Sequence, residues 1–142
     1  MEVRLILGDQ LNENHSWFIE PNNKVCYVMF EMRQETDYVR HHIQKVVAFF
    51  ASMRFFARKL EEYGHSVIYY TIDDPNNTQN LTENLHNVLD LLKATSFAYQ
   101  LPDEFRLDEQ LKELSSSLNI RVKAYDTEHF LTTRKELAEF YE

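Results

Sequence analysis

The sequence predicts an α/β protein with a doubly wound, mainly parallel sheet of five strands. Short, β-rich apolar runs alternate with longer segments whose apolar residues recur every three or four positions. Strands and helices that alternate in this way form right-handed crossovers, which place helices on both faces of a parallel sheet. The chain has 142 residues, of which 44% are hydrophobic, and this size suits a single domain spanning residues 1–142.

The first two strands are predicted at 3–7 and 25–32. The run Val3 to Leu7 is mostly apolar and stops at Gly8, as a buried parallel strand does when it leaves the sheet. The connection at 12–23 is polar and turn-like, with Trp17 and Phe18 interrupting it, and its pattern does not predict a helix.

A long helix is predicted from Thr36 to Leu60, because its apolar residues fall on one helical face. Thr36 can cap its N-terminus, and Gly64 can supply a left-handed stop. The apolar face consists of Val39, Ile43, Val46, Phe50, Met53, Ala57 and Leu60.

The rest of the chain continues the alternation of strands and helices. Strands are expected at 66–72, 96–101 and 120–125, the second of them less apolar than the others. Helices are expected at 78–93 and 107–118, where leucines recur at helical spacing, and again in the tail at 132–141. Residues 73–77 form the loop after the third strand. No linker or repeat divides the chain.

Charge and composition exclude several classes of protein. The 23 acidic and 15 basic residues give a net charge of -8, which disfavours direct nucleic-acid binding by this chain. The first residues are unlike a signal peptide, and no run reaches the ~18 apolar residues that span a membrane, so we expect no membrane contact and a cytoplasmic location. The single cysteine, Cys26, can form neither an intrachain disulfide nor a four-cysteine metal site, and we expect it to be buried.

Other motifs of catalysis or cofactor binding are missing. Gly8 and Gly64 are the only glycines, so neither a glycine-rich dinucleotide fingerprint nor a P-loop is present. The six histidines form no His-Glu-x-x-His pattern, and we predict structural roles for them and no metal site. No nucleophile and base can be paired, so no catalytic residue is predicted.

Acidic residues follow every predicted strand. Ligands of open α/β sheets bind outside the carboxyl ends of the strands, and this edge is rich in acceptors and poor in cations. It suits a ligand that presents N–H and hydroxyl donors, such as a flavin-like ring with a polyol. Each acid could instead cap a helix or face solvent, but Asp9 and Glu35 follow central strands and are favoured as ligand contacts. The acids are Asp9, Glu35, Asp73, Asp74, Asp103, Glu104, Asp126 and Glu128.

Several segments together resemble one family. Residues 5–11 (LILGDQL), 31–42 (EMRQETDYVRHH) and 52–57 (SMRFFA) are similar in order and spacing to the opening of the deoxyribodipyrimidine photolyase-related proteins. These are bacterial cryptochromes and six-four photolyases that carry an iron–sulfur cluster. Residues 72–75, 77–78 and 102–106 extend the resemblance over most of the chain.

The resemblance implies a flavodoxin-like or Rossmann-like N-terminal domain that holds an antenna chromophore, 6,7-dimethyl-8-ribityllumazine. The FAD and the iron–sulfur cluster of this family belong to a C-terminal domain that these residues do not include, so no catalysis is expected from this chain alone. The role implied for the whole protein is light-dependent DNA repair or blue-light signalling. The contacts implied for the lumazine are Gly8, Asp9, Gln10, Leu11, Met32, Glu35 and Tyr38.

An alternative is a protein-interaction domain that has lost chromophore binding and pairs through surface once covered by the catalytic half, although Asp9 and Glu35 favour the chromophore-binding hypothesis. Leu101 stands where the family pattern leads us to expect a polar or acidic residue, which leaves a contact from the fourth strand unsupported. The long helix also carries more aromatic residues than one buried stripe can hold, so some should face water. The expected partners are the missing FAD domain or a second copy of the chain. The aromatic residues are Tyr38, Phe49, Phe50, Phe55, Phe56 and Tyr63.

Overall fold

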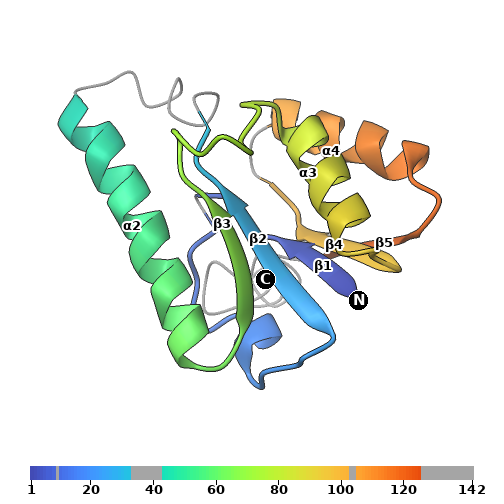
Figure 1. Cartoon of the computed structure of the whole chain (residues 1–142), viewed down its shortest axis with the longest axis horizontal. Coiled ribbons are helices and arrows are strands. Elements are labelled where there is room, and N and C mark those ends of the chain that lie inside the picture. The colour runs from blue at the N-terminus through green and yellow to red at the C-terminus, as the bar shows by residue number, and fades with distance from the viewer. Residues whose placement is uncertain (9, 33–42, 103–104, 126–142) are drawn as a thin grey trace, which may run out of the picture.

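The computed structural model describes residues 1–8, 10–32, 43–102 and 105–125, and in it a five-stranded sheet carries helices on both faces (Figure 1). The elements are β1 (Glu2–Leu5), the 3-10 helix η1 (Ser16–Phe18), β2 (Val25–Phe30), α2 (Ile43–Glu62), β3 (Ser66–Tyr70), α3 (Leu81–Leu91), β4 (Ser96–Gln100), α4 (Phe105–Ser117) and β5 (Arg121–Tyr125).

The strand order is β3-β2-β1-β4-β5, and every neighbouring pair is parallel. The chain moves outward from β1 to β3, and α3 then carries it back across the sheet to β4. The prediction of a doubly wound parallel sheet is therefore confirmed, and the order reverses between β1 and β4. The strands end one or two residues earlier than predicted at several ends. The predicted start of the long helix at Thr36 and the tail helix at 132–141 lie outside the described residues.

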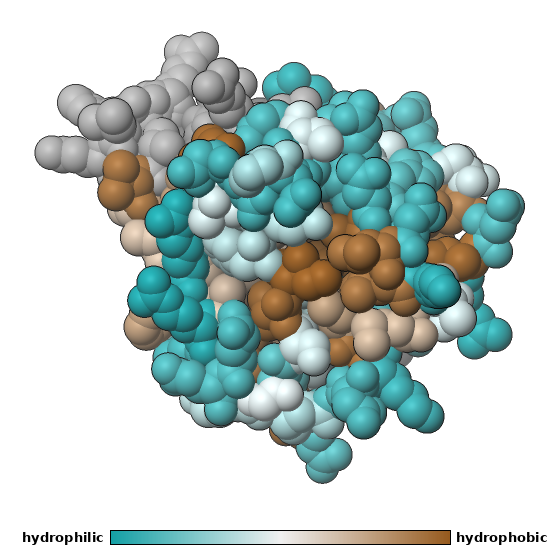
Figure 2. All heavy atoms as spheres, in the orientation of Figure 1, coloured by the Kyte–Doolittle hydropathy of each residue, from teal (hydrophilic) through white to brown (hydrophobic). Residues whose placement is uncertain are grey.

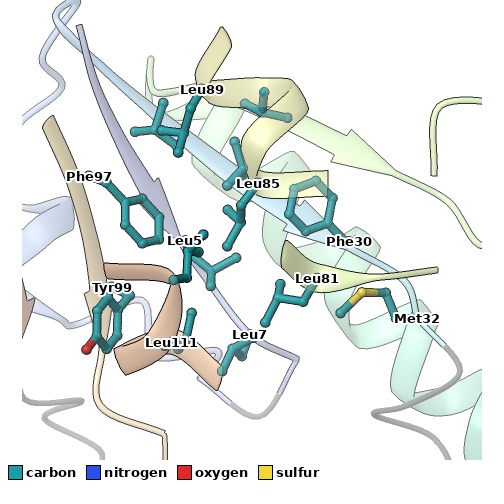
Figure 3. Packing of buried hydrophobic residues seen from close by; sticks show 14 residues of the cluster. Leu5, Leu7, Phe30, Met32, Leu81, Leu85, Leu89, Phe97, Tyr99 and Leu111 are labelled. Carbon is teal, nitrogen blue, oxygen red and sulfur yellow. The ribbon is translucent and has the colours of Figure 1, made fainter. Parts of the chain in front are cut away.

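Two hydrophobic clusters hold the layers together. On one face, Leu81 and Leu85 of α3 and Leu111 of α4 pack against Leu5 and Phe97 of the sheet (Figure 3). On the other face, α2 packs its buried stripe against the sheet; the cluster there includes Ile6, Trp17, Met29, Met53, Phe56, Leu60 and Ala98. Both faces of the central strands are thus buried, which explains why β2 reads as six consecutive buried residues. Cys26 lies among them with 5% of its surface exposed, as predicted.

The helices α2 and α3 end in the same way with different residues. At the end of α2, His65 N–H donates to the carbonyl of Leu60, and Gly64 lies in the left-handed region with φ 95°. At the end of α3 the equivalent residue is Lys93, with φ 51°. A side chain is strained in this region by about 1 kcal/mol, so only the first of these ends is marked in the sequence by glycine.

The connection between β1 and β2 has one short 3-10 turn, in agreement with the absence of a predicted helix. His15 Nδ1 accepts the N–H of Trp17 at 3.1 Å and so caps this turn, a structural role as predicted. The Tyr27 hydroxyl donates to the Trp17 carbonyl at 2.8 Å, and the Arg4 guanidinium lies 5.3 Å from the Trp17 ring. These contacts hold an irregular segment against the sheet.

Part of the helix α2 faces water, as the aromatic content predicts. Phe50 and Phe56 are buried, whereas Phe55 and Tyr63 are each 61% exposed. Figure 2 shows another hydrophobic area, in the middle of one face beside α3 and over the strands. Within the described residues, no helix combines the length and the apolar character needed to cross a bilayer.

We predict that His65 makes the fold sensitive to mild acid. Burial lowers the pKa of its imidazole, against the opposing effect of the Phe18 carbonyl. Below about pH 6.5 the unfolded chain therefore takes up a proton that the folded chain resists, and stability falls with pH by at most about 1.4 kcal/mol per pH unit. Between pH 7.5 and 5.5, the free energy of unfolding measured in urea should fall less for His65→Phe than for the unmodified protein. The phenylalanine ring suits the neighbouring Phe18 and Tyr27. Equal losses in both proteins would contradict this.

Candidate functional site

The reversal between β1 and β4 marks where this sheet can bind a ligand. Connections leave neighbouring strands in opposite directions there and leave a crevice at the carboxyl edge. The loop that leaves β1 contains Gly8, Gln10 and Leu11, and β4 ends at Gln100 on the other side. The described residues thus bring part of the predicted contact set to this point.

Gln10 fixes the loop across the reversal point. Its Oε1 accepts the N–H of Leu7 at 3.1 Å, and its Nε2 donates to the carbonyl of Gln100 at 3.1 Å. With 2% exposure, Gln10 is part of the framework of the site. Its predicted contact with a ligand would have to use the remaining capacity of that amide.

Gly8 lies where the sheet meets α2. A Cβ at this position would stand 2.3 Å from Cζ of Phe49 and 3.0 Å from Sδ of Met53, so any side chain would displace the helix residues. The glycine is needed here for close packing of backbone against side chain.

The Gln100 side chain is the unusual feature of this edge of the sheet. It has no exposed surface, yet neither its Oε1 nor its Nε2 has a hydrogen-bond partner among the described residues. Buried amides are nearly always paired, because an unpaired group keeps the cost of losing water.

The other predicted contacts lie in different places. Leu11 lines an open groove of about 840 Å³ against α2, together with Phe55, Phe56 and Lys59. Met32 is 1% exposed and packs on the opposite face of the sheet, near Leu81 (Figure 3). Gly8 therefore faces the α2 layer, whereas the Met32 side chain lies in the layer of α3 and α4. Asp9, Glu35 and Tyr38 lie outside the described residues.

A buried acid follows β2 at the same edge. Both Glu31 oxygens bind Arg54 of α2, with Nε at 2.6 Å and Nη2 at 2.8 Å. The Tyr69 hydroxyl of β3 donates to the same carboxylate at 2.5 Å, and the Ile72 N–H donates at 3.0 Å. Glu31 has no exposed side-chain surface, whereas 46% of the Arg54 side chain is exposed.

The charges in this network are fixed by one another. Burial alone would raise the pKa of Glu31, but the hydrogen bonds from Arg54, Tyr69 and the Ile72 N–H outweigh it and lower that pKa. Burial and the adjacent carboxylate raise the pKa of Tyr69, which keeps its proton. The carboxylate is therefore held as an anion, and it is an acceptor whose capacity is largely used.

Asparagines extend this network to the other helix layer. Asn77 Nδ2 donates to the Glu31 carbonyl at 2.7 Å, and Asn84 of α3 donates to Asn77 Oδ1 at 3.0 Å. The loop between β3 and α3 is thus held over the end of β2. In this loop a hydrogen bond from Thr71 is the main cause that lowers the pKa of Asp73, and the charge of Arg54 contributes.

The sequence analysis missed Glu31, Arg54 and Gln100. It described the edge as poor in cations, but the half-exposed Arg54 lies there. One signal was present: Glu31 is a single acid directly after an apolar strand, and burial of a carboxylate requires a partner. Nothing in the sequence identifies that partner, which lies 23 residues away.

These observations define a class of protein: an open, doubly wound α/β domain in which buried polar side chains, those of Gln10 and Gln100, lie at the carboxyl edge between β1 and β4. In the described part of the chain, no group of histidine, cysteine and acidic side chains is arranged to hold a metal ion.

Comparison with known proteins gives the family. The family model for "Deoxyribodipyrimidine photo-lyase-related protein" matches residues 4–142, and the chain belongs to this family. A (6-4) photolyase of Agrobacterium fabrum (strain C58 / ATCC 33970) is 30% identical over 136 residues, which cover 95% of this chain. The same alignment covers 27% of the photolyase, so the chain spans little more than a quarter of that relative's length.

We predict that Arg54→Met destabilises the protein more than Glu31→Gln does. Removing the cation leaves a buried carboxylate with fewer partners, at a cost of about 3 kcal/mol at pH 7, whereas the Arg54 freed by Glu31→Gln can turn to water. In the unmodified protein the lowered pKa of Glu31 adds stability above about pH 4.5 that is lost as pH falls through the folded pKa. In Arg54→Met the buried acid should instead take up a proton more readily, so the difference from the unmodified protein should shrink between pH 7 and 5.

Denaturant unfolding at both pH values tests this, with Arg58→Met, an exposed residue of the same helix, as the control. A deficit of Arg54→Met that stays constant from pH 7 to 5 would show that its effect does not arise from the buried charge.

Proposed function

We propose that this chain is an antenna-chromophore domain that binds 6,7-dimethyl-8-ribityllumazine at the crevice between β1 and β4. The observation that carries the proposal is the position of the order reversal, next to the loop that contains Gly8, Gln10 and Leu11. Membership of the photolyase-related family supports the same assignment. The full contact set proposed is Gly8, Asp9, Gln10, Leu11, Met32, Glu35 and Tyr38.

The chemistry of the edge suits this ligand. A lumazine presents a ring N–H, ring carbonyls and ribityl hydroxyls, and it carries no phosphate. Asp9 and Glu35 would accept hydrogen bonds from N–H or hydroxyl groups of the ligand. Gly8 would contribute only through its backbone, because Phe49 and Met53 fill the space beside its Cα. The Met32 side chain packs in the layer of α3 and α4, so its role would be to support the end of β2 from that layer.

In the whole protein, this domain would serve light-dependent DNA repair or blue-light signalling. The antenna supplies absorption of light, and an FAD-bearing region outside these 142 residues would use the excitation. Catalysis and direct nucleic-acid binding are not proposed for this chain.

We predict that Asp9→Asn and Glu35→Gln each weaken lumazine binding. Loss of one charge-assisted hydrogen bond should cost about 1.5–3 kcal/mol, or roughly ten- to a hundredfold in Kd. Absorption titration of the purified chain with the lumazine measures this. Asp90→Asn, an exposed acid on α3, is the matched control. Unchanged affinity in both site variants, with intact folding, would refute these contacts.

Exposed apolar residues favour a second candidate, a protein-interaction domain. Three apolar or aromatic residues are each 61% exposed: Val47 and Phe55 on α2, and Tyr63 directly after it. Phe55 borders the groove that Leu11 also lines. A partner such as the FAD domain or a second copy of the chain would pack on Phe55 beside this groove.

We predict that the isolated chain self-associates at micromolar concentration and that Phe55→Ser weakens the association. Sedimentation velocity across a hundredfold dilution series measures it. Phe105→Ser, which changes a 72% exposed phenylalanine on α4, should have little effect. A single monomeric species at every concentration would argue against an interaction surface on α2.

A further inference from the structure

The unpaired amide of Gln100 requires an explanation beyond packing. Gln100 is the last residue of β4 and has no exposed surface, and both ends of its side-chain amide lack hydrogen-bond partners among the described residues. Its backbone carbonyl is hydrogen-bonded, since it accepts from Gln10 Nε2. Only the side chain, a group with one acceptor and one donor end, is left unsatisfied.

The side chain of Gln100 faces the α2 layer. Side chains alternate along β4: Phe97 and Tyr99 lie in the α3 and α4 cluster, whereas Ala98 lies in the α2 cluster. Gln100 follows Ala98 by two residues, and its partner in β5, Tyr125, packs against the α2 cluster.

Gly8, in the loop that follows the neighbouring strand β1, faces the same layer. The direction of its absent Cβ leads to Phe49 and Met53 of α2. Leu5 pairs with Tyr99, so Gly8 follows the level of Gln100 by two residues. The unpaired amide of Gln100 and the glycine against which Phe49 and Met53 pack therefore flank the reversal point on the α2 face.

We infer that Gln100 is a specificity-determining residue, whose amide binds adjacent N–H and C=O groups at the imide edge of the ring of the bound lumazine. This inference rests on the proposed function and adds a contact from the fourth strand, where Leu101 offered none. The ligand N–H donates to Oε1, and Nε2 donates to the ligand carbonyl. A planar amide and a planar imide edge form both bonds at once, whereas one ribityl hydroxyl satisfies a single end with good geometry.

The buried position of the Gln100 amide gives this contact its selectivity. Ile6 and Ala98 are buried members of the α2 cluster and offer no other hydrogen bonds from their side chains. A ring that lacks the N–H leaves Oε1 without a partner in a place that water does not reach. Such sites reject the deficient analogue more strongly than purely apolar pockets do.

The decisive experiment is Gln100→Met, because it changes stability and affinity in opposite directions. Methionine has nearly the same shape and no group that needs a hydrogen bond, so it should raise the Tm of the ligand-free chain by roughly 5 °C. The same change should weaken binding of 6,7-dimethyl-8-ribityllumazine about tenfold or more. Gln110→Met, on α4 at the opposite face, is the matched control and should change neither strongly.

The N3-methyl derivative of the lumazine tests which ligand group is bound. The unmodified chain should bind this derivative about tenfold more weakly, and Gln100→Met should lose most of that discrimination. Should Gln100→Met fail to fold, the side-chain amide signals of Gln100 in the unmodified chain replace it: NMR should show them shift and gain protection from exchange when the lumazine binds.

The outcomes separate this inference from the proposed function. If the unmodified chain does not bind the lumazine, both fail. If it binds and Gln100→Met binds equally well, or the Gln100 amide signals do not move, the role of Gln100 is refuted and the antenna function stands.

Discussion

Glu31 joins the two helix layers to the sheet. Its carboxylate accepts from Arg54 of α2 and Tyr69 of β3, and its backbone carbonyl accepts from Asn77, which in turn accepts from Asn84 of α3. A buried carboxylate is tolerated only when several donors surround it. The position of the loops at this edge is therefore set by the requirement to satisfy one charge, and the crevice beside it is built on a fixed frame.

The general fold follows from local patterns in the sequence. Periods of two and of three to four residues distinguish strands from helices, and Gly64 marks the end of α2. The end of α3 is less visible, because Lys93 takes the left-handed conformation that usually indicates glycine. The strand order depends on contacts between distant residues, so the sequence predicted a doubly wound parallel sheet without the order of its strands. The particular domain type was predicted from the resemblance to a known family, because periodicity alone does not distinguish one doubly wound domain from another.

The site is harder to predict for a physical reason. Arg54 reaches Glu31 across the boundary between helix and sheet. Gln100 is unusual only because its side-chain amide has no hydrogen-bond partner among the described residues. A sequence states which groups can form hydrogen bonds, but it does not state which of them are left unpaired after folding. The two faces of the sheet matter as well. Gly8 and Met32 were both predicted as ligand contacts because each follows a central strand, but Gly8 faces the α2 layer and the Met32 side chain lies in the opposite layer.

The packing of Trp17 gives the protein a built-in optical reporter. Trp17 is the only tryptophan of the chain, it is 6% exposed, and its ring lies 5.3 Å from that of Tyr125 at the end of β5. Its emission therefore comes from one apolar place, where the irregular connection after β1 meets the last strand. Any bound molecule that absorbs in the range of this emission would quench it by resonance energy transfer. The fluorescence of the unmodified protein can thus follow folding and ligand occupancy without an attached dye.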